Sequence, residues 1–503
     1  MSQRADTTTT SVFPVLGPQP VFAVSAALGV LMAAVLCAGG RFREAAAAAL
    51  IIVGLGFVIS ARVSVSTIIV TWFAASPVAS FYVRFPYDKS ILTFNRAVFL
   101  LIAVLVLIRS KGAVRSGVKG DALGIARSGL LGTATQFEIA WAVLSLAALM
   151  SALLKSDDLG YAGKIALDSF CLPLLAFRLA RHHLELRDHA RWLTLAAIGL
   201  ALFLFATGAY ELATGTDLFT YKGSELIRAG ERRVNGPFAA DSSFSIICLM
   251  LFLFLRAAPE AFRLRFDKSS RLLYECALAA ALMGSLLSMF RTLAIALMAS
   301  WMLLEFSGRK AISVKTNSFG GRWLIAALIG LTALAAVLAP SMFGGRLADP
   351  TNAFSRVATW EAGVGIAAEH PLFGVGLANY GDYFRAKYNW EDESVEQVMN
   401  TRALASPHSN LIWIAAELGW IALMFYVIAN VWLGLMGWKA LKRARSETQR
   451  ASAACFLSLV VAYWITGFTL TSGAYSDLNL SFFFLLGLLS QRFDRSGVPI
   501  ELA

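Results

Sequence analysis

One histidine of this chain stands where acid–base chemistry would be favoured. His408 lies in Ala405-Ser406-Pro407-His408-Ser409-Asn410, directly before a long apolar run. Because Pro407 favours a helix start, we expect His408 in the first turn of the helix that follows. A helix N-terminus disfavours protonation of an imidazole, and a neutral imidazole can act as a general base. A histidine that only hydrogen-bonds to its loop at a membrane edge is the structural alternative.

Three arginines stand beside apolar segments and form a second candidate group. Arg232 and Arg233 directly precede Val234-Asn235-Gly236-Pro237-Phe238, and Arg291 follows Ser288-Met289-Phe290. Guanidinium groups hold a diphosphate bidentately and stabilise its charge as it leaves. Lipid headgroups would satisfy the same side chains, since arginines near span ends commonly reach toward them. The sequence leaves both alternatives open.

Two carboxylates fall inside apolar segments, where an ionised group is costly and must have a partner. Glu417 lies in the run from Leu411 to Gly419, and Asp168 lies in the segment 162–180. Their position fits a structural pairing as well as a functional role. No H-E-x-x-H, Gly-rich phosphate loop or paired D-x-D motif occurs, so we expect neither a metal site nor a cofactor.

The composition places these residues in a membrane protein. Of 503 residues, 57% are hydrophobic and 15% charged, whereas soluble domains average about 45–50% and about 25%. The formal net charge of +12 therefore indicates topology rather than nucleic-acid binding. All five cysteines lie in apolar runs without C-x-x-C spacing, which argues against disulfides and a cysteine metal site.

The apolar segments predict an all-α polytopic transmembrane helix bundle of about 12–14 spans. The segment 63–79 is the weakest, because it is short and ends at Pro77, and it is equally compatible with a re-entrant or interfacial helix. Fourteen candidate segments can be marked: 20–38, 44–61, 63–79, 93–109, 134–154, 162–180, 192–209, 241–255, 273–289, 291–306, 323–340, 410–437, 452–468 and 478–490.

The basic loops orient this bundle, because Lys and Arg are retained on the cytoplasmic side. The loops 109–127, 178–191, 256–271, 309–322 and 439–450 are rich in Lys and Arg and are predicted to be cytoplasmic. The connections 155–161, 210–240, 288–291, 341–407 and 469–477 then face outward. Arg41 and Arg43 do not fit this alternation, so the topology of the first three segments stays open.

The outward loop 341–407 divides the chain into three parts. Residues 1–340 form an N-terminal transmembrane bundle with the outer loop 210–240, 341–407 a partly helical loop, and 408–503 the C-terminal transmembrane helices. Ser355 to Glu369 is predicted to be helical from the spacing of its apolar residues. Six loop aromatics are candidates for sugar stacking or for a small core: Trp360, Tyr380, Tyr383, Phe384, Tyr388 and Trp390.

Ordered motifs along residues 233–419 resemble those of the bacterial O-antigen ligase and polymerase family. The ligases tend to show His, then Asn, Ser or Gln, nine further residues, a Gly, two more residues and a Gly, Thr or Tyr. His408, Ser409 and Gly419 fit this pattern, but Ala422 departs from its last position. The choice between ligase and polymerase therefore stays open. The matching motifs are Arg233-Val234-Asn235-Gly236-Pro237-Phe238, Ser288-Met289-Phe290-Arg291, Arg356-Val357-Ala358-Thr359-Trp360, His370-Pro371-Leu372-Phe373-Gly374-Val375-Gly376-Leu377, His408-Ser409-Asn410 and Glu417-Leu418-Gly419.

The resemblance implies a GT-C-like glycosyltransferase of the bacterial inner membrane, with its active site on the periplasmic side. Its donor would be a glycan linked to undecaprenyl diphosphate. Its acceptor would be lipid A-core in a ligase of lipopolysaccharide biosynthesis, or a second saccharide repeat in an O-antigen or exopolysaccharide polymerase. A transporter or flippase that moves the lipid-linked glycan without bond chemistry is the alternative from another class.

The resemblance also implies roles for individual residues. His408 would be catalytic and activate the acceptor hydroxyl, while Arg233 and Arg291 would bind the diphosphate. Arg356 is a weaker diphosphate-binding candidate. The expected supporting residues are Arg232, Asn410 and Glu417.

Overall fold

The computed structural model describes residues 64–85, 92–115, 134–184, 186–219, 234–287, 291–308, 351–387 and 406–493. Three of the predicted segments, 20–38, 44–61 and 323–340, lie outside these ranges. Arg232, Arg233, Tyr388 and Trp390 lie outside them too.

Helices form nearly all of the described structure, as predicted. Each of the eleven predicted apolar segments within the described residues is helical. The N-terminal helices are α3 (Val65–Tyr82), α4 (Phe94–Arg115), α6 (Gln136–Lys155), α7 (Leu159–Ala166), the π-helix η1 (Leu167–Cys171), α8 (Leu172–His182) and α9 (Leu186–Thr214). They are followed by α10 (Asp241–Phe262), α11 (Lys268–Leu287), α12 (Arg291–Gly308), α15 (Thr351–Glu369), α16 (Tyr380–Lys387), α18 (Asn410–Arg443), α19 (Glu447–Thr469), the 3₁₀ helix η3 (Ser472–Ala474) and α20 (Ser476–Ser490).

The only extended pairing in the described ranges is a two-residue antiparallel ladder. Strand β1 (Arg84–Phe85) pairs with β2 (Leu92–Thr93) between α3 and α4. It is a local turn feature, so the all-α class stands.

Eight of the described helices are long and apolar enough to cross a membrane. Three shorter apolar helices accompany them, Phe94–Val106, Thr292–Ser307 and Ser476–Ser490. An apolar surface on this scale requires a lipid environment, so the prediction of a polytopic membrane bundle is confirmed.

The weakest predicted segment is a continuous helix. Helix α3 passes through Pro77 and ends only at Tyr82, so the expectation that Pro77 ends it is wrong. Proline is tolerated inside membrane helices. Side chains of the turn before Pro77 join α3 to α4, since Asn95 Oδ1 accepts hydrogen bonds from Trp72 Nε1 at 2.8 Å and from Ser76 Oγ at 3.0 Å.

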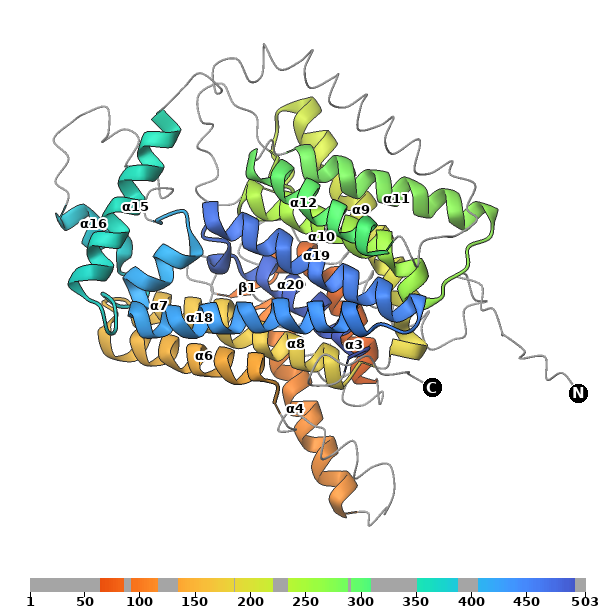
Figure 1. The fold of residues 1–503 in the computed structure, drawn as a ribbon, viewed down its shortest axis with the longest axis horizontal. Coiled ribbons are helices and arrows are strands. Elements are labelled where there is room, and N and C mark those ends of the chain that lie inside the picture. Colours follow the sequence, from red (N-terminus) through yellow and green to blue (C-terminus); the bar gives the residue numbers. More distant parts are fainter. Residues whose placement is uncertain are drawn as a thin grey trace, which may run out of the picture.

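The helices surround α10, which is buried along most of its length and packs against α9, α11 and α19. Helices α6, α8, α18, α19 and α20 run side by side, as Figure 1 shows. On the outside of this bundle, α6 and α18 each expose a row of large apolar side chains, as expected of helices in contact with lipid. These two lipid-facing rows are Ile139, Val143, Leu146, Met150, Leu153 and Leu154 on α6, and Trp420, Met424, Val427 and Val431 on α18.

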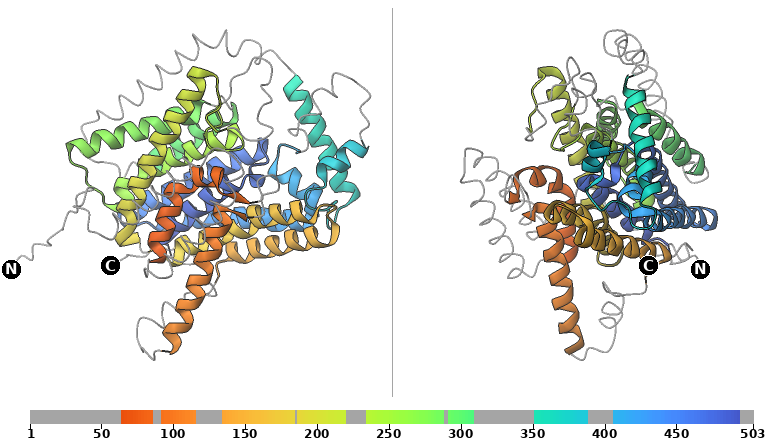
Figure 2. Two further views of the ribbon diagram at one scale, coloured as in Figure 1. Left: turned by 180° about the vertical axis from the view of Figure 1, so that it is seen from behind. Right: turned by 90° about the vertical axis from the view of Figure 1, so that its left-hand side faces the viewer.

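Helices α15 and α16 lie at one end of the bundle and cross the ends of α6 and α18 (Figures 1 and 2). The helix predicted for Ser355 to Glu369 is confirmed and begins earlier, at Thr351. The apolar residues of this helix are not all on its buried face. Thr359, Ala362, Ile366 and Ala367 face the protein, whereas Val364 is 53% exposed.

A buried ion pair joins the start of α6 to α8 at the opposite end of the bundle. Arg178 Nη1 donates to Glu138 Oε1 at 2.8 Å, and the two side chains are only 11% and 2% exposed. The other carboxylate oxygen, Glu138 Oε2, accepts from the Thr135 backbone N–H at 2.6 Å in a capping box. This one carboxylate therefore serves both a helix start and a buried guanidinium.

We expect Glu138→Ala to lower the free energy of unfolding by about 3–5 kcal/mol, because it removes the carboxylate that faces a buried cation. The measurement is thermal unfolding of the purified protein in detergent. Glu275→Ala is the matched control, since its partner Arg271 lies at a similar 2.9 Å but the two side chains are 51% and 46% exposed. That exposed pair should contribute less than about 1 kcal/mol. Equal losses in the two variants would contradict the prediction.

Candidate functional site

Helix α18 is broken at Gly419, in the middle of an apolar run. Gly419 has φ 84° and ψ 176° inside an otherwise helical segment. This backbone conformation is essentially restricted to glycine. The break separates a first half of nine residues, Asn410 to Leu418, from the long second half that crosses the bundle, and we call it the Gly419 break.

The segment that follows α15 supplies hydrogen-bond partners at the break. The Val375 N–H donates to the Ala416 carbonyl at 2.9 Å, and the Gly376 N–H to the Glu417 carbonyl at 3.0 Å. In the other direction, the Trp420 N–H donates to the Pro371 carbonyl at 2.7 Å. The motifs His370 to Leu377 and Glu417 to Gly419 are therefore two sides of one backbone interlock.

Glycines allow the two chains to approach this closely. A Cβ atom at Gly374 would collide with the backbone of Glu417, and one at Gly419 would collide with the Leu372 carbonyl. Both glycines also have positive φ angles, 62° and 84°. Gly374 and Gly419 thus make the contact between the loop and the broken helix possible.

The carboxylate of Glu417 has the partners that the sequence required. It accepts hydrogen bonds from the backbone N–H groups of Ala378 at 2.9 Å and Tyr380 at 3.2 Å, and from Trp413 Nε1 at 2.8 Å. Its residue is 4% exposed. Through the two backbone N–H groups, the Glu417 carboxylate positions the start of α16 against α18.

The end of α6 contacts the same loop from the other side. Lys155 Nζ donates to the Gly374 carbonyl at 3.0 Å, and the Lys155 carbonyl accepts from Asn379 Nδ2 at 2.9 Å. Ser151 Oγ accepts from the Leu377 N–H at 3.0 Å. The loop between α15 and α16 is therefore fixed between the end of α6 and the Gly419 break.

His408 precedes the helix rather than lying in its first turn. Helix α18 begins at Asn410 with Ser409 as its N-cap residue, and His408 has a left-handed φ of 50°. The expectation of a first-turn histidine is therefore wrong, because the chain reverses its backbone geometry at His408 before the helix starts. A non-glycine residue held in this region stores strain, which is often found at functional sites. We call this end of the bundle the His408 end.

The segment before His408 is joined to the connection between α19 and α20. The hydroxyl groups of Ser406 and Thr471 share a short hydrogen bond, and Ser406 Oγ also accepts from the His408 N–H at 3.4 Å. Asn410 Nδ2 donates to Ser472 Oγ at 2.8 Å, and Asn410 Oδ1 accepts from the Gly473 N–H at 2.8 Å. Asn410 thus anchors the start of α18 to η3.

The backbone of Arg291 reaches the same end. Arg291 is the first residue of α12, and the next residue, Thr292, accepts a hydrogen bond at its Oγ1 from Thr469 Oγ1 at 2.8 Å. Thr469 ends α19, two residues before Thr471. One short chain segment therefore contacts both the start of α12 and the segment that leads to His408.

The chain that follows Arg233 is held by a buried carboxylate that the sequence did not single out. Glu211, at the end of α9, accepts from the backbone N–H groups of Asn235 at 3.0 Å and Gly236 at 2.9 Å. Its other oxygen accepts from the Leu218 N–H at 3.3 Å. The sequence signal for Glu211 is weaker than that for Glu417, because Glu211 lies just beyond the apolar segment 192–209 rather than inside it.

Arg356 is half-buried in the second turn of α15, which packs on the first half of α18. Gly363 lies against Ile412, and the Ala367 carbonyl accepts from Trp420 Nε1 at 3.2 Å. Both contacts advance along the two helices in the same direction. Arg356 lies on the N-terminal side of Gly363, toward the start of α18.

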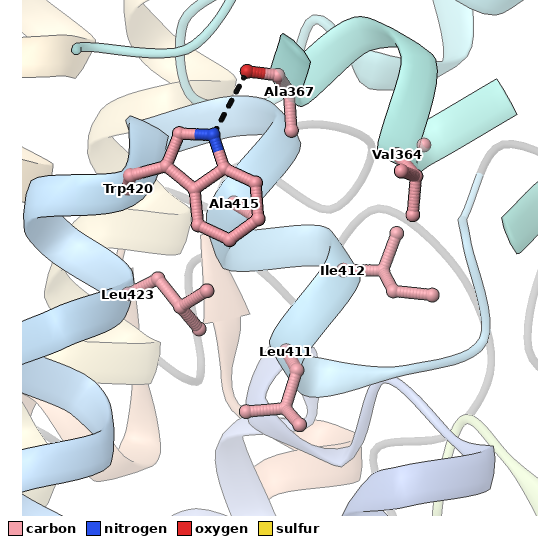
Figure 3. A pocket seen from close by; sticks show the side chains of 8 residues that line it. Val364, Ala367, Leu411, Ile412, Ala415, Trp420 and Leu423 are labelled. Carbon is pink, nitrogen blue, oxygen red and sulfur yellow. Dashed lines mark hydrogen bonds between the residues drawn. The ribbon is translucent and has the colours of Figure 1, made fainter. Parts of the chain in front are cut away.

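A small apolar groove separates these helices. It has a volume of about 190 Å³ and is lined by Gly363, Val364, Ala367, Leu411, Ile412, Ala415, Trp420 and Leu423. Figure 3 shows α15 and the two halves of α18 around it. The groove extends along α18 from the Gly419 break to Leu411, three residues after His408.

Asp168 also has a defined partner, which the sequence did not identify. Arg96 Nε and Nη2 donate to its two carboxylate oxygens at 2.8 and 2.7 Å, and both side chains are 10% exposed. Asp168 lies in η1, which packs against η3. The bidentate pair therefore stands beside the connection that contacts Asn410.

Two of the loop aromatics are core residues. Tyr380 and Phe384 are buried against Ala362, Ile366 and Ala416, and their rings stack at a centroid distance of 5.9 Å. Tyr380 Oη donates to the Thr359 carbonyl at 2.7 Å. This small core holds α16 against α15 and the first half of α18.

The described residues contain no group of three or more His, Cys, Asp or Glu side chains that could hold a metal ion. Among the described residues, the hydroxyl groups of Ser406 and Thr471 and the amide of Asn410 lie in the chain segments beside His408 and take part in hydrogen bonds within the protein.

We expect Gly419→Ala to destabilise the contact between the loop and α18, because its Cβ would collide with the Leu372 carbonyl and its φ is strained. The expected loss exceeds about 2 kcal/mol, and hydrogen exchange should accelerate at Val375 and Gly376. Gly199→Ala is the control, since a Cβ there meets nothing within 4 Å in helix α9. Unchanged hydrogen exchange in the Gly419 variant would refute the interlock.

Comparison with known proteins identifies the segment that carries these features. Residues 242–427 match the family model described as O-antigen ligase. No curated protein matches the chain. The matched segment contains Arg291, Arg356, His408, Asn410 and Glu417, whereas Arg233 precedes it. The region from α10 to the second half of α18, with the Gly419 break and His408 within it, thus belongs to the O-antigen ligase family.

Proposed function

We propose that this protein transfers a glycan from undecaprenyl diphosphate to a saccharide acceptor on the periplasmic face of the bacterial inner membrane. The O-antigen ligase family assignment supports a membrane glycosyltransferase of the ligase or polymerase type. The donor, the acceptor and the side of the membrane are our inference from the motifs and the loop charges.

The observation that carries this proposal is the surroundings of His408. Its strained backbone lies beside hydroxyl and amide groups, and the connection from Thr469 to Thr471 joins it to the start of α12, where Arg291 stands. Glycosyl transfer from a diphosphate needs a proton acceptor and a positive charge near the reacting centre. The backbone positions of His408 and Arg291, joined through Thr469 to Thr471, support this proposal.

In the proposed reaction, the acceptor hydroxyl oxygen attacks the anomeric carbon of the donor sugar. The bond between that carbon and the diphosphate oxygen breaks, and the electron pair leaves with the diphosphate. His408 takes the proton of the attacking hydroxyl, while Arg233 and Arg291 neutralise the growing charge on the leaving group. Attack from the opposite face inverts the anomeric configuration, and the donor itself supplies the driving force.

A polymerase and a ligase differ only in the acceptor that this site admits. Purified protein incubated with a lipid-linked repeat alone distinguishes them. Chain growth indicates a polymerase, whereas transfer that begins only after lipid A-core is added indicates a ligase.

A flippase remains the second candidate, because a broken membrane helix is typical of transporters. The Gly419 break would favour it, yet the backbone groups there are bound by the loop rather than open to a transported ion. A carrier would move labelled lipid-linked glycan across proteoliposomes without forming a glycosidic bond.

We expect His408→Ala to reduce glycan transfer about 100-fold or more, because it removes the proposed general base. Transfer is measured by the gel shift of the acceptor, and binding of the donor should persist. His189→Ala, a histidine near the start of α9, is the control and should retain transfer. Unaltered transfer in the His408 variant would exclude His408 as the general base, whereas an absence of transfer by the wild-type protein would favour the carrier.

We expect Arg291→Ala to reduce transfer about 100-fold, with a similar loss for Arg233→Ala, because each removes one cation from the leaving diphosphate. Arg291→Lys should lie between the wild type and Arg291→Ala, since lysine keeps the charge but loses the bidentate geometry. Arg271→Ala, in the exposed pair of α11, should leave transfer unchanged. Full activity in both arginine variants would instead indicate headgroup-binding or structural roles.

A further inference from the structure

The turn that fills the Gly419 break presents two large apolar side chains to the outside. Leu372 is 59% exposed and Phe373 is 61% exposed. Their backbone is fixed, since the Pro371 carbonyl accepts from Trp420 N–H and the Gly374 N–H donates to the His370 carbonyl at 3.0 Å. The side chains are therefore held outward by a rigid turn.

On one side, this turn adjoins the lipid-facing row of α6. Lys155 Nζ lies 5.6 Å from the centroid of the Phe373 ring. Leu153 and Leu154, the two residues before Lys155, are 62% and 73% exposed and belong to a helix that can span the membrane. Phe373 thus stands at the level at which the exposed apolar surface of α6 ends.

On the other side, the turn adjoins the lipid-facing row of α18. Trp420, which hydrogen-bonds to Pro371, is 48% exposed, and the next residue, Ile421, is 43% exposed. Both begin the part of α18 that runs across the bundle. The exposed turn is therefore continuous with lipid-facing surface on two different spans.

We propose that Leu372 and Phe373 form a membrane anchor that inserts into the acyl-chain region of the leaflet at the His408 end. The occupant of this surface is bilayer hydrocarbon, because the surface adjoins both lipid-facing rows, with Lys155 at the edge between Leu154 and Phe373. Large apolar side chains joined to such rows are shielded from water by lipid chains.

The groove between α15 and α18 opens beside the same surface. Val364, which is 53% exposed, and Trp420 both belong to its lining, and none of its eight lining residues is charged. Figure 3 shows Val364 and Trp420 on either side of the groove. Hydrocarbon chains can therefore cover α15 on this side as well as the turn.

Charged side chains set the depth of the anchor. Glu361 and Glu369 on α15 are exposed, and the Asp382–Arg385 pair on α16 is 67% and 63% exposed. Such groups stay at the headgroup level, where Trp and Tyr side chains are also favourable. The charged sides of α15 and α16 thus lie at the headgroup level, whereas the turn and the groove side of α15 face the hydrocarbon.

The experiment places an environment-sensitive fluorophore on single cysteines in proteoliposomes. Cys37, Cys171, Cys248, Cys276 and Cys455 are replaced first, and Phe373→Cys is then labelled. Leu154→Cys on α6 is the control for lipid contact, and Arg385→Cys on α16 is the control for an aqueous site. Nitroxide groups on lipid acyl chains and dissolved iodide are the two quenchers.

If the turn is an anchor, the probe at position 373 should behave like the probe at position 154. The lipid nitroxide should quench it several-fold more strongly than the probe at position 385, and iodide should quench it little. Iodide quenching equal to that at 385 would overturn the proposal. Protection from both quenchers would also overturn it, because the turn would then be covered by protein.

A second measurement serves if the cysteine-free chain does not fold. Hydroxyl-radical footprinting of the unmodified chain in lipid nanodiscs compares Phe373 with Tyr383, a half-buried residue of α16. The anchor predicts slower oxidation of Phe373 than its exposed fraction would give in water. Faster oxidation of Phe373 than of Tyr383 would contradict it. Neither measurement depends on glycan transfer, so the anchor and the proposed function can fail separately.

Discussion

The hydrogen bonds that the loop makes at the Gly419 break are the constraint on which the rest of the candidate site depends. A membrane helix cannot be interrupted unless its freed carbonyl and N–H groups find partners within the protein. The segment from Pro371 to Gly376 supplies these partners at Ala416, Glu417 and Trp420. The break in turn allows the first half of α18 to take a different direction from the second half. The start of this first half, preceded by His408, lies against α15.

Buried carboxylates fix the loops at this end through backbone N–H groups. Glu417 holds the start of α16, and Glu211 holds the turn that follows Arg233. A carboxylate that accepts two or three N–H groups fixes the chain more firmly than a neutral side chain would, because charge-assisted hydrogen bonds are stronger. Sequence segments far apart are thus held in fixed positions without large globular domains.

The helices could be predicted from the sequence, whereas the break could not. Hydropathy over 410–437 is uninterrupted, so one straight helix was the natural expectation, and glycine is common inside membrane helices. The break becomes visible only with the loop in place, since the collision at Leu372 and the bond to Pro371 are long-range contacts. For the same reason the partner of Asp168 was missed, because Arg96 lies 72 residues away in the sequence.

The strained geometry of His408 is best explained by the same long-range contacts. A left-handed backbone at a histidine costs free energy, so neighbouring contacts must stabilise it. Asn410, two residues after His408, hydrogen-bonds to η3, and Ser406, two residues before His408, shares a hydrogen bond with Thr471. These contacts hold the chain on both sides of His408. A helix start with His408 in its first turn would relieve the strain but would shift Asn410 away from η3. The observed conformation is therefore the one that keeps the start of α18 joined to the connection that also contacts α12.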